Sequence, residues 1–296
     1  MHLHNLDNNK KFPKITYFDR IALRGGVQEW FIWPVSKTER VVRLTQVQIL
    51  SPPLSKRKIK TGNALMYKNL LISVVIPCLN EEHGITKVLS QMPIFVDEVI
   101  VINNNSTDNT VINAQKYNAR IINVAKKGYG KALKAGIKAA KGKVIITMDG
   151  DGTYSPKAIK NIIAFLVSNS LDFVSTNRLN REYKNYYPRV HLFGNKLLSL
   201  LVLVLFKRNI SDILSGMMCF RSKIFPLLTL NEEDMSFSEE IKLEALTNSR
   251  IKFAQYPIEF SYHDRLGTTK LNLFKDGIKA CAYLLNAKLN RSRLRR

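Results

Sequence analysis

The sequence contains no continuous run of about 20 apolar residues, the length that a membrane-spanning helix requires. Its longest apolar run, Leu197 to Phe206, is half that length and is bounded by Lys196 on one side and Lys207 on the other. We expect this segment to form a buried helix, and the alternative is an interfacial helix that dips into lipid. The first residues also lack the apolar core of a signal peptide.

Cysteine and histidine are scarce in this chain. The three cysteines, Cys78, Cys219 and Cys281, are far apart and form no C-x-x-C pair. This spacing argues against a zinc site or a disulfide scaffold, fits a reducing compartment, and makes the cysteines small buried apolar residues. The five histidines are dispersed along the chain and suggest no metal cluster.

Acidic residues are few, with 23 aspartates and glutamates against 46 lysines and arginines, which gives a formal net charge of +23. Such an excess favours an anionic partner, which is a nucleic acid, an anionic membrane surface or a phosphorylated substrate. The sequence contains no nucleic-acid-binding motif and no basic patch studded with aromatic residues, so we expect no nucleic-acid partner. With 45% hydrophobic residues over 296 positions, the chain can form a globular protein of one or two domains.

Residues 1–65 show no sustained hydrophobic periodicity, and the stretch QILSPPLSKRKIKTGN near their end reads as a linker. We expect either a disordered basic extension or a translated stretch of non-coding sequence. The second alternative rests on Pro34 to Thr38 and Val47 to Leu50, whose possible codons resemble the anticodon hairpin and T-arm of a transfer-RNA gene. The protein would then start at Met66, and in either case the folded domain is expected to span residues 66–296.

From Leu71 onward, short β-branched runs alternate with segments of helical periodicity. The pattern predicts strands at residues 71–76, 98–102, 120–124, 143–148 and 171–176, and helices at residues 84–92, 110–117 and 131–141. Alternation at this spacing predicts an α/β fold with a mainly parallel sheet that helices cover on both faces. Such sheets bind ligands beyond the carboxyl ends of their strands.

Polar stretches follow the first four expected strands, at the point where each strand ends. They are PCLNEE (77–82), NNNSTDNT (103–110), AKKGYGK (125–131) and DGDGTY (149–154). The third stretch has no G-x-G-x-x-G pattern, so it is not a dinucleotide-binding fingerprint. We expect the functional residues to lie in these four stretches.

The fourth stretch places two carboxylates, Asp149 and Asp151, two residues apart. Alternate side chains of extended backbone point the same way, so both carboxylates can meet one hard divalent cation, Mg²⁺ or Mn²⁺. These ions are often held by few protein oxygens and complete their shell with substrate phosphates. The alternative is that DGDG is only a turn between two elements, because Asp-Gly pairs favour turns.

Six motif-like stretches occur along the chain in this order: VVIPCLNEE, VIVINNNSTDNT, KKGYGKALKAGIKAAKG, MDGDGTYSPKAI, SDILSGMMCFRSKIF and FSEEIKLEALTNSRIKFAQYPIEFSYHDRLGTTKLN. Together they resemble the motifs of the GT-A, family-two inverting glycosyltransferases, in the branch of dolichyl-phosphate mannose synthase and polyprenyl-phosphate glucose synthase. The resemblance runs from about Leu71 to the C-terminal helix. It implies a Rossmann-like GT-A fold and metal-dependent, inverting transfer of a hexose from a UDP- or GDP-linked donor.

The resemblance also implies roles on the donor side. Asp149 and Asp151 hold the donor diphosphate through the metal, and Thr153 either contacts a metal-bound water or caps the following helix. The glycines of KKGYGK let the backbone approach the donor, with Lys127 or Lys131 near its phosphates unless both lysines only begin a solvated helix. The other residues expected to bind the donor are Pro77, Asn80, Glu81, Asn103, Asn105 and Asp108.

Asn103 is the chief departure from the family pattern, which usually has an aspartate at this position. A carboxylate accepts two donors from guanine, whereas an amide has one acceptor oxygen, which suffices for the single N3–H of uracil. We therefore hypothesise a preference for UDP-sugars.

The acceptor implied by the resemblance is a polyprenyl or dolichyl phosphate. Its oxygen is already anionic at neutral pH, so attack on the anomeric carbon requires cations that hold two phosphates together rather than a strong base. The expected cations are Arg178, Arg189, Arg221, Arg265 and Lys270, of which Arg178 and Arg265 are expected to be catalytic. The alternative acceptor is a hydroxyl group of an envelope polysaccharide, which requires a carboxylate base, with Asp212, Glu239 and Glu240 as the candidates.

Residues 273–296 combine apolar residues at helical spacing with a basic end, consistent with docking on anionic lipid. The alternative is a helix packed on the core with a frayed tail. We expect a cytoplasmic protein, peripheral on the inner face of the membrane, held there by the lipid surface or by a membrane-protein partner. A function of another class, a catalytically silent scaffold, is disfavoured because both Asp149 and Asp151 are present.

Overall fold

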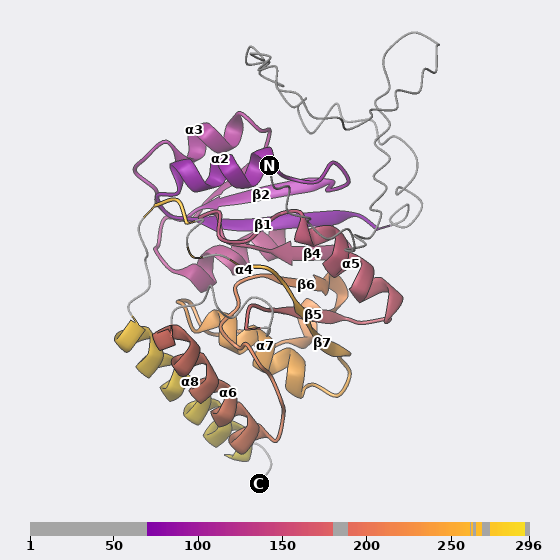
Figure 1. Ribbon diagram of the computed structural model, residues 1–296, viewed down its shortest axis with the longest axis vertical. Helices are drawn as coiled ribbons and strands as arrows, with labels where there is room; N and C mark the ends of the chain where they lie inside the picture. The colour runs from indigo at the N-terminus through magenta and orange to yellow at the C-terminus, as the bar shows by residue number, and fades with distance from the viewer. Residues whose placement is uncertain (1–69, 180–188, 261, 263–264, 268–272, 294–296) are drawn as a thin grey trace, which may run out of the picture. The chain divides into compact units, whose positions relative to one another are not determined.

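The computed structural model describes residues 70–179, 189–260, 262, 265–267 and 273–293 (Figure 1). All described helices and strands belong to the second of two units into which the chain divides, Leu50–Arg296. Residues 1–65, Met66 and Lys270 lie outside the described residues. The expectations for the N-terminal segment, the start of the domain and Lys270 therefore stay predictions.

A seven-stranded sheet in the order β3-β2-β1-β4-β6-β5-β7 forms the centre of the described domain (Figure 1). Its strands are β1 (Ile72–Cys78), β2 (Glu98–Asn103), β3 (Arg120–Asn123), β4 (Val144–Thr147), β5 (Phe173–Asn177), β6 (Met218–Arg221) and β7 (Phe253–Pro257). Neighbouring strands are parallel, except that β6 runs antiparallel to both β4 and β5. The five strands expected from the sequence and the mainly parallel α/β sheet are confirmed.

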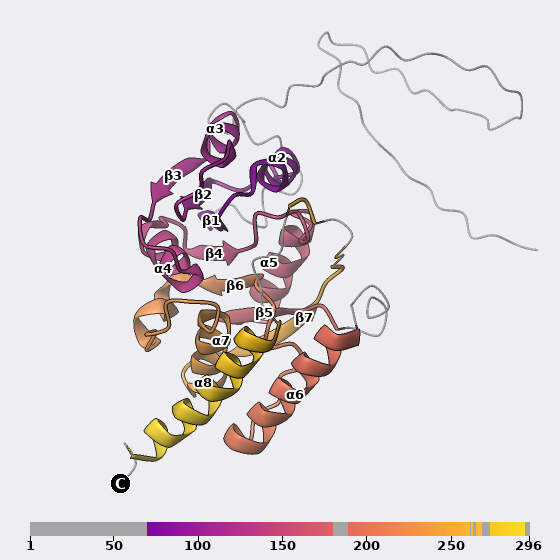
Figure 2. The same ribbon diagram turned by 90° about the vertical axis from the view of Figure 1, so that its left-hand side faces the viewer.

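Helices cover both faces of this sheet (Figures 1 and 2). They are α2 (Glu82–Ser90), α3 (Thr110–Gln115), α4 (Tyr129–Ala139), α5 (Ala158–Ser168), α6 (Arg189–Phe206), α7 (Phe237–Thr247) and α8 (Leu273–Arg293), with a 3₁₀ helix at Ser222–Leu227. The three helices expected from the sequence are α2, α3 and α4, and each begins within two residues of its expected start.

The side chains of β1 alternate between two apolar layers, as the period of a strand requires. Val74 and Ile76 pack with the buried residues of α2, α3 and α5, whereas Val75 packs with those of α4 and α7. Because both faces are covered, β1 and β4 are almost continuously apolar and β-branched. The buried sheet holds the carboxyl ends of its strands in fixed positions.

Helices α6 and α8 pack against each other at one side of the domain (Figure 2). Only Asn195, Leu198 and Val202 of α6 are buried, so the expectation of a buried helix is wrong for this segment. The helix is also longer than the apolar run Leu197–Phe206, because it begins at Arg189. Within the described ranges α6 alone is long and apolar enough to cross a membrane, a test that some helices of soluble proteins also pass.

Gly84 lets α2 lie directly against the loop that follows β4. A Cβ atom at this position would lie 2.4 Å from the carbonyl oxygen of Gly150 and 2.7 Å from Cα of Asp151. These obstacles are backbone atoms, which cannot rotate away as a side chain can.

We therefore expect Gly84→Ala to lower the free energy of unfolding by about 1–3 kcal/mol, the range for overpacking a close contact. Urea unfolding followed by circular dichroism measures this change. Gly277→Ala on α8 is the matched control, because no atom lies within 4 Å of its Cβ position. The control should be neutral or stabilising by up to about 1 kcal/mol. Equal stability of the two variants would contradict the close contact.

Candidate active site

Asn104 joins three of the four polar stretches at the carboxyl edge of the sheet. Its backbone N–H donates to the carbonyl oxygen of Cys78 at 2.9 Å, which ties the end of β2 to the end of β1. Its side-chain nitrogen donates to the carbonyl oxygen of Lys126 at 3.0 Å, and its side-chain oxygen accepts from the Gly128 N–H at 2.8 Å. This buried amide therefore fixes the loop before α4 against the central strands.

The loops after β1 and β2 are bound to each other. The side-chain oxygen of Asn80 accepts from the Thr107 N–H at 2.8 Å, and the Glu81 N–H donates to the Thr110 hydroxyl at 2.8 Å. Asp108 accepts from the Glu82 N–H at 3.1 Å. Partial burial alone would raise the pKa of Asp108, but hydrogen bonds from Thr110 and the backbone lower it. The pair of loops thus forms one rigid wall.

A cleft of about 450 Å³ opens beside this wall. Four of the expected donor-binding residues line it together, namely Asn80, Glu81, Asp108 and Lys127. Its volume lies within the usual range for small-molecule sites, about 300–1,000 Å³. Of the other expected residues, Pro77 is half-buried on β1, and Asn105 is exposed with a left-handed backbone (φ 67°).

The orientation of the Asn103 amide is set by its neighbours. The side-chain oxygen accepts from the Ser106 N–H at 2.8 Å, and the side-chain nitrogen donates to Oδ1 of Asn123 at 2.9 Å. A backbone N–H can only donate, so the oxygen of Asn103 must face Ser106. The amide keeps one lone pair and one hydrogen for a further partner.

Asp149 is a buried carboxylate directly after β4. The Tyr129 hydroxyl donates to it at 3.1 Å, and Gly216 packs so closely that a Cβ there would lie 2.8 Å from Oδ2 of Asp149. Burial first, and then the negative charge of Asp151, raises the pKa of Asp149 to about 6. The two carboxylates are therefore close enough to oppose each other's ionisation.

Asp151 is held on three sides. Its Oδ1 accepts from the Thr153 hydroxyl at 2.6 Å and from the Thr153 N–H at 3.0 Å, and its Oδ2 pairs with Nη2 of Arg265 at 2.9 Å. The Leu266 N–H donates to its carbonyl oxygen at 2.9 Å. Thr153 does not cap the next helix, because α5 begins at Ala158. The capping alternative for Thr153 is therefore wrong.

The two aspartates fit a hard divalent cation. Such a cation would relieve the repulsion that raises the pKa of Asp149, and carboxylate oxygens are the ligands that Mg²⁺ and Mn²⁺ prefer. Over the described ranges no group of three or more His, Cys, Asp or Glu residues converges. A cation here would take its remaining ligands from water and from substrate oxygens, as is usual for Mg²⁺.

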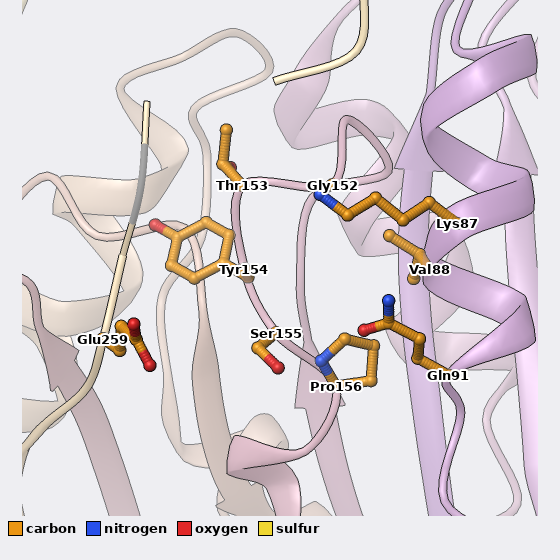
Figure 3. A pocket seen from close by; sticks show the side chains of 9 residues that line it. All are labelled: Lys87, Val88, Gln91, Gly152, Thr153, Tyr154, Ser155, Pro156 and Glu259. Atoms are coloured by element: carbon orange, nitrogen blue, oxygen red, sulfur yellow. The ribbon is translucent and has the colours of Figure 1, made fainter. Parts of the chain in front are cut away.

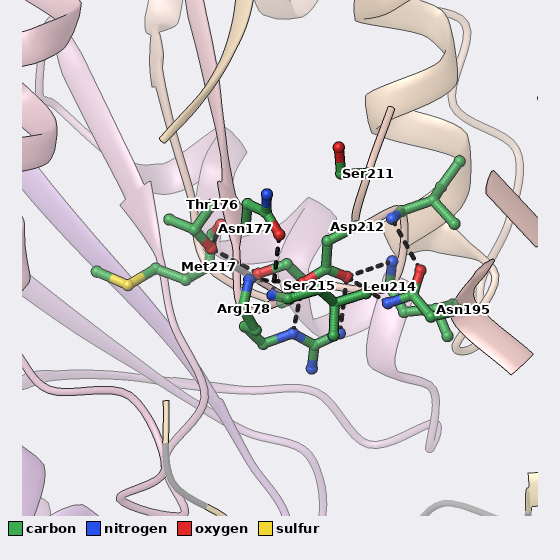
Figure 4. Close-up of polar contacts among 12 residues, drawn as sticks. Thr176, Asn177, Arg178, Asn195, Ser211, Asp212, Leu214, Ser215 and Met217 are labelled. Carbon is green, nitrogen blue, oxygen red and sulfur yellow. Dashed lines mark hydrogen bonds and ion pairs between the residues drawn. The ribbon is translucent and has the colours of Figure 1, made fainter. Parts of the chain in front are cut away.

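Arg178 and Asp212 form a buried ion pair behind this edge (Figure 4). Nε and Nη2 of Arg178 donate to the two carboxylate oxygens at 2.8 and 2.9 Å, and the Arg178 N–H donates at 3.0 Å. Asn195 of α6 adds a hydrogen bond of 2.6 Å. Burial alone would raise the pKa of Asp212, but the Arg178 guanidinium lowers it to about 2. A carboxylate with so low a pKa is too weak a base to remove a proton from a hydroxyl acceptor, the role for which Asp212 was a candidate.

Lys242 is a fully buried lysine that the sequence did not single out. Its ammonium group donates to the carbonyl oxygen of Ser215 at 2.6 Å, next to the Gly216 that touches Asp149. The Gly216 N–H in turn donates to the Tyr154 hydroxyl at 2.8 Å. Burial lowers the pKa of Lys242 to about 8. On a helix, one lysine among apolar and acidic neighbours reads as a surface residue, so the sequence carried no signal for this contact.

The structure corrects the expectation for Arg221. This residue pairs with Val144 at the start of β4, because β6 runs antiparallel to β4. It therefore lies at the opposite end of the sheet from Asp149, where its Nε donates to the carbonyl oxygen of Leu171 at 2.9 Å. Arg221 cannot bind the phosphates of a substrate held at Asp149.

The two remaining basic candidates differ in their surroundings. Lys131 pairs with Glu233 at 2.8 Å, whereas Arg189 is exposed at the start of α6.

The two acidic candidates on α7, Glu239 and Glu240, also differ. Glu240 accepts the N–H groups of Asn231 and Glu232 at 2.8 and 2.9 Å, which fixes the loop before α7. Glu239 is buried, its Oε2 has no hydrogen-bond partner among the described residues, and burial raises its pKa to about 7.

A second, smaller hollow of about 230 Å³ lies between α2 and the loop that follows Asp151 (Figure 3). Lys87 and Gln91 line it from α2, and Glu259 lines its other side. Apart from Thr153, it includes none of the residues expected to act on substrate. The larger cleft is therefore the better candidate for the donor.

A sheet of this order, with paired carboxylates after β4 and a cleft at the carboxyl edge, defines a GT-A type glycosyltransferase fold. The model of the family "Glycosyl transferase family 2" matches residues 73–227, just over half of the chain. The chain belongs to this family and is a glycosyltransferase.

Two relatives from Haloferax volcanii are similar over most of the chain. The low-salt glycan biosynthesis hexosyltransferase Agl6 is 28% identical over 221 residues, which are 72% of this chain and 53% of Agl6. A dolichyl-phosphate hexose transferase is 29% identical over 209 residues, 70% of this chain and 89% of the relative. The chain thus spans about half of the length of Agl6 and most of the second relative.

A solved structure shares the fold. Glucosyl-3-phosphoglycerate synthase from Mycobacterium tuberculosis, crystallised with Mn²⁺, UDP and glucosyl-3-phosphoglycerate, superposes with a TM-score of 0.58 at 24% identity. The superposition covers 76% of this chain and 80% of the synthase.

We expect Asp212→Asn to lower the free energy of unfolding at pH 7 by about 3–5 kcal/mol, because it leaves the Arg178 charge buried without its partner. The double variant Arg178→Met/Asp212→Leu should lose less, since it removes both charges. Urea unfolding of the three proteins measures both effects. A double variant as unstable as Asp212→Asn would mean that the charge pair is not the cause.

The same pair predicts a pH dependence. The pKa of Asp212 is about 2 in the folded chain and about 3.9 when unfolded, so its contribution is complete above the unfolded value and is lost as pH falls towards 2. The wild type should lose this part of its stability between about pH 4 and pH 2, and Asp212→Asn should not.

Proposed function

We propose that this glycosyltransferase moves a hexose from a nucleoside-diphosphate sugar to a polyprenyl or dolichyl phosphate, with inversion at the anomeric carbon. The observation that carries the proposal is the crowded pair Asp149 and Asp151 beside a nucleotide-sized cleft. Mg²⁺ or Mn²⁺ held by these carboxylates would neutralise the leaving diphosphate. The UDP and Mn²⁺ in the crystals of the mycobacterial synthase support this choice of donor and metal.

On the donor side, the proposal assigns the cleft to the nucleotide. Asn80, Glu81 and Asp108 line the part formed by the two bound loops, and Lys127 adds a cation to the lining of the same cleft. Pro77, Asn103 and Asn105 extend this wall towards the base. Lys131 is a weaker candidate for the phosphates because it already pairs with Glu233.

On the acceptor side, Arg265 is the cation best placed for a second phosphate. Its Nη2 rests on Asp151, and its Nε is buried without a hydrogen-bond partner among the described residues. An unsatisfied buried donor of this kind suits a phosphate oxygen, and arginine's planar fork can bind one while keeping Asp151. Arg178 acts indirectly, by fixing Asp212 and the segment that ends at Gly216.

In the proposed reaction an oxygen of the acceptor phosphate attacks the anomeric carbon as the bond from that carbon to the donor phosphate breaks. The acceptor oxygen is already anionic, so no proton has to be removed. This suits a site in which Asp212 is a very weak base. The products are a hexosyl polyprenyl phosphate and a nucleoside diphosphate. The dolichyl-phosphate hexose transferase among the relatives supports this acceptor.

A hydroxyl acceptor is the second candidate, and one observation favours it. Glu239 is buried, its pKa is raised to about 7 and its Oε2 lacks a hydrogen-bond partner among the described residues. A carboxylate with such a pKa is better suited to remove a proton at neutral pH than Asp212 is. Glu239→Gln would abolish transfer to a hydroxyl, whereas transfer to a lipid phosphate would persist.

The proposed place of action is the cytoplasmic surface of the membrane, where the enzyme is peripheral. A lipid phosphate keeps its chain in the bilayer, so the enzyme must work at that surface or beside a membrane-protein partner.

The first test is transfer of label from UDP- and GDP-sugars into organic-extractable lipid, with Mn²⁺ or Mg²⁺ and undecaprenyl or dolichyl phosphate. Asp149→Ala should reduce transfer by a factor of about a hundred or more, because the metal loses a ligand. It should not destabilise the fold, since one of two repelling buried carboxylates is removed. Glu259→Gln, an exposed carboxylate, is the control that should keep full activity. Metal-dependent donor hydrolysis without labelled lipid would favour the hydroxyl acceptor.

The second test concerns the base of the donor. The free acceptor and donor of Asn103 match the adjacent N3–H and carbonyl of uracil, whereas a carboxylate would match the two N–H donors of guanine. We expect tighter binding of UDP than GDP by calorimetry, and a shift of at least about tenfold towards GDP in Asn103→Asp, the loss expected when a polar pair is mismatched. Asn123→Ala should weaken the discrimination without reversing it. Tighter binding of GDP by the wild type would contradict this role of Asn103.

A further inference from the structure

Helices α6 and α8 carry most of the exposed apolar surface of the described domain. Ten of the fifteen large apolar side chains that are exposed among the described residues belong to these two helices. They include Phe193 (72% exposed), Leu200 (54%) and Val204 (55%) of α6, and Phe274 (83%), Ile278 (70%) and Leu289 (57%) of α8. We call these six residues the α6–α8 face.

The spacing of these residues places them on one side of each helix. On α6 the exposed positions 193, 200 and 204 recur at helical spacing, and Leu198 and Val202 lie on the opposite side. On α8 the positions 274, 278 and 289 share one side, and Ala280 and Leu284 lie on the other. The buried sides pack together with Leu243 of α7. Both exposed stripes therefore point away from the rest of the domain.

Basic residues surround the α6–α8 face. Helix α6 contains no acidic residue, and α8 contains only Asp276. Lys196, Lys207 and Arg208 are exposed on or just after α6, and Lys275 and Lys288 are exposed on α8. An apolar stripe with cations beside it matches the interface of a bilayer with anionic head groups.

The charges also decide between a bilayer and a second copy of the chain. A symmetric dimer through this face would bring two basic rims together, which costs binding free energy through like-charge repulsion. An anionic bilayer accepts the apolar stripe and the cations at the same time.

The helix pair is placed to lie on the membrane rather than to cross it. Asn195 of α6 donates to the buried Asp212 at 2.6 Å and its oxygen accepts from the Ile213 N–H at 3.3 Å. A spanning α6 would have to withdraw this amide from the ion pair and leave it in hydrocarbon, where an unsatisfied polar group is costly.

We propose that the α6–α8 face is the surface by which this enzyme lies on an anionic bilayer, with α6 and α8 in the plane of the interface. This docking surface rests on the proposed function in one respect, namely that a lipid-linked acceptor explains why the enzyme would bind a membrane. The apolar stripe supplies insertion, and the lysines and arginines beside it supply selectivity for anionic lipid. Helix α6 also links the face to the segment behind the site, since its buried Asn195 donates to Asp212.

Sedimentation of the full-length protein with vesicles tests this proposal. We expect binding to vesicles of phosphatidylcholine with phosphatidylglycerol, weaker binding to phosphatidylcholine alone, and a decrease with added salt. Phe193→Ser/Leu200→Ser/Ile278→Ser should bind at least tenfold more weakly. The matched control is Leu71→Ser/Ile94→Ser/Ile112→Ser, which removes three comparably exposed apolar side chains elsewhere and should bind as the wild type does.

A second variant separates the charge from the apolar contact. Lys196→Glu/Arg208→Glu should lose most of the preference for anionic vesicles and its salt dependence, while urea unfolding stays as in the wild type. It also tests the surface without exposing or removing any apolar residue, in case the serine variant folds poorly.

Three results would overturn the proposal. One is unchanged vesicle binding by both variants, and another is equal loss in the matched control. The third is sedimentation velocity that shows a wild-type dimer, dissociated by the serine variant, with no vesicle binding.

Transfer to a short, water-soluble prenyl phosphate should be the same in the serine variant and the wild type, because the face does not touch substrate. If the wild type binds vesicles but transfers no sugar to any prenyl phosphate, the proposed acceptor fails and the docking surface stands. If the wild type transfers sugar to the soluble acceptor but does not bind vesicles, the docking surface fails and the proposed acceptor stands.

Discussion

The close pairing of two buried carboxylates, Asp149 and Asp151, is the constraint on which the rest of the site depends. Burial and mutual repulsion make this pair costly, as the raised pKa of Asp149 indicates. Polar neighbours offset part of this cost. The Tyr129 hydroxyl donates to Asp149, and Thr153 and Arg265 bind Asp151. Glycines at positions 84 and 216 keep the backbone close enough for these contacts. The fold thus stores a negative site in a chain that is strongly positive overall.

A second layer of buried charge stands behind this pair and keeps it in place. Arg178 and Asp212 satisfy each other almost completely, and Lys242 holds the peptide that precedes Gly216. Buried pairs of this kind add little to stability but penalise any arrangement in which one partner is missing. They therefore specify one geometry for the segment from Asp212 to Gly216. The antiparallel strand β6 begins two residues after that segment, at Met218.

The parts of the fold that could be predicted are those encoded by local periodicity. The five expected strands and α2, α3 and α4 follow from runs of β-branched residues and from helical spacing, and the polar stretches after the strands do line one edge. The expectations that failed, or that could not be made, depend on how the strands are ordered and directed in the sheet. Arg221 lies in a motif that also contains Asp212, yet the direction of β6 carries it to the far end of the sheet. The burial of Lys242 and the orientation of the Asn103 amide likewise depend on neighbours that are distant in sequence.

The expectation for α6 failed for a different reason, and the reason bears on function. An apolar composition shows that a helix avoids water but does not show whether protein or lipid covers it. In this domain the buried stripe of α6 carries Asn195, which is bound to Asp212, while its broad apolar stripe faces outward. One helix thus contacts the charged layer behind the site on one side and presents the α6–α8 face on the other. The proposed acceptor has an anionic head and a lipid tail, and α6 connects the segment behind the site with the surface proposed to meet lipid.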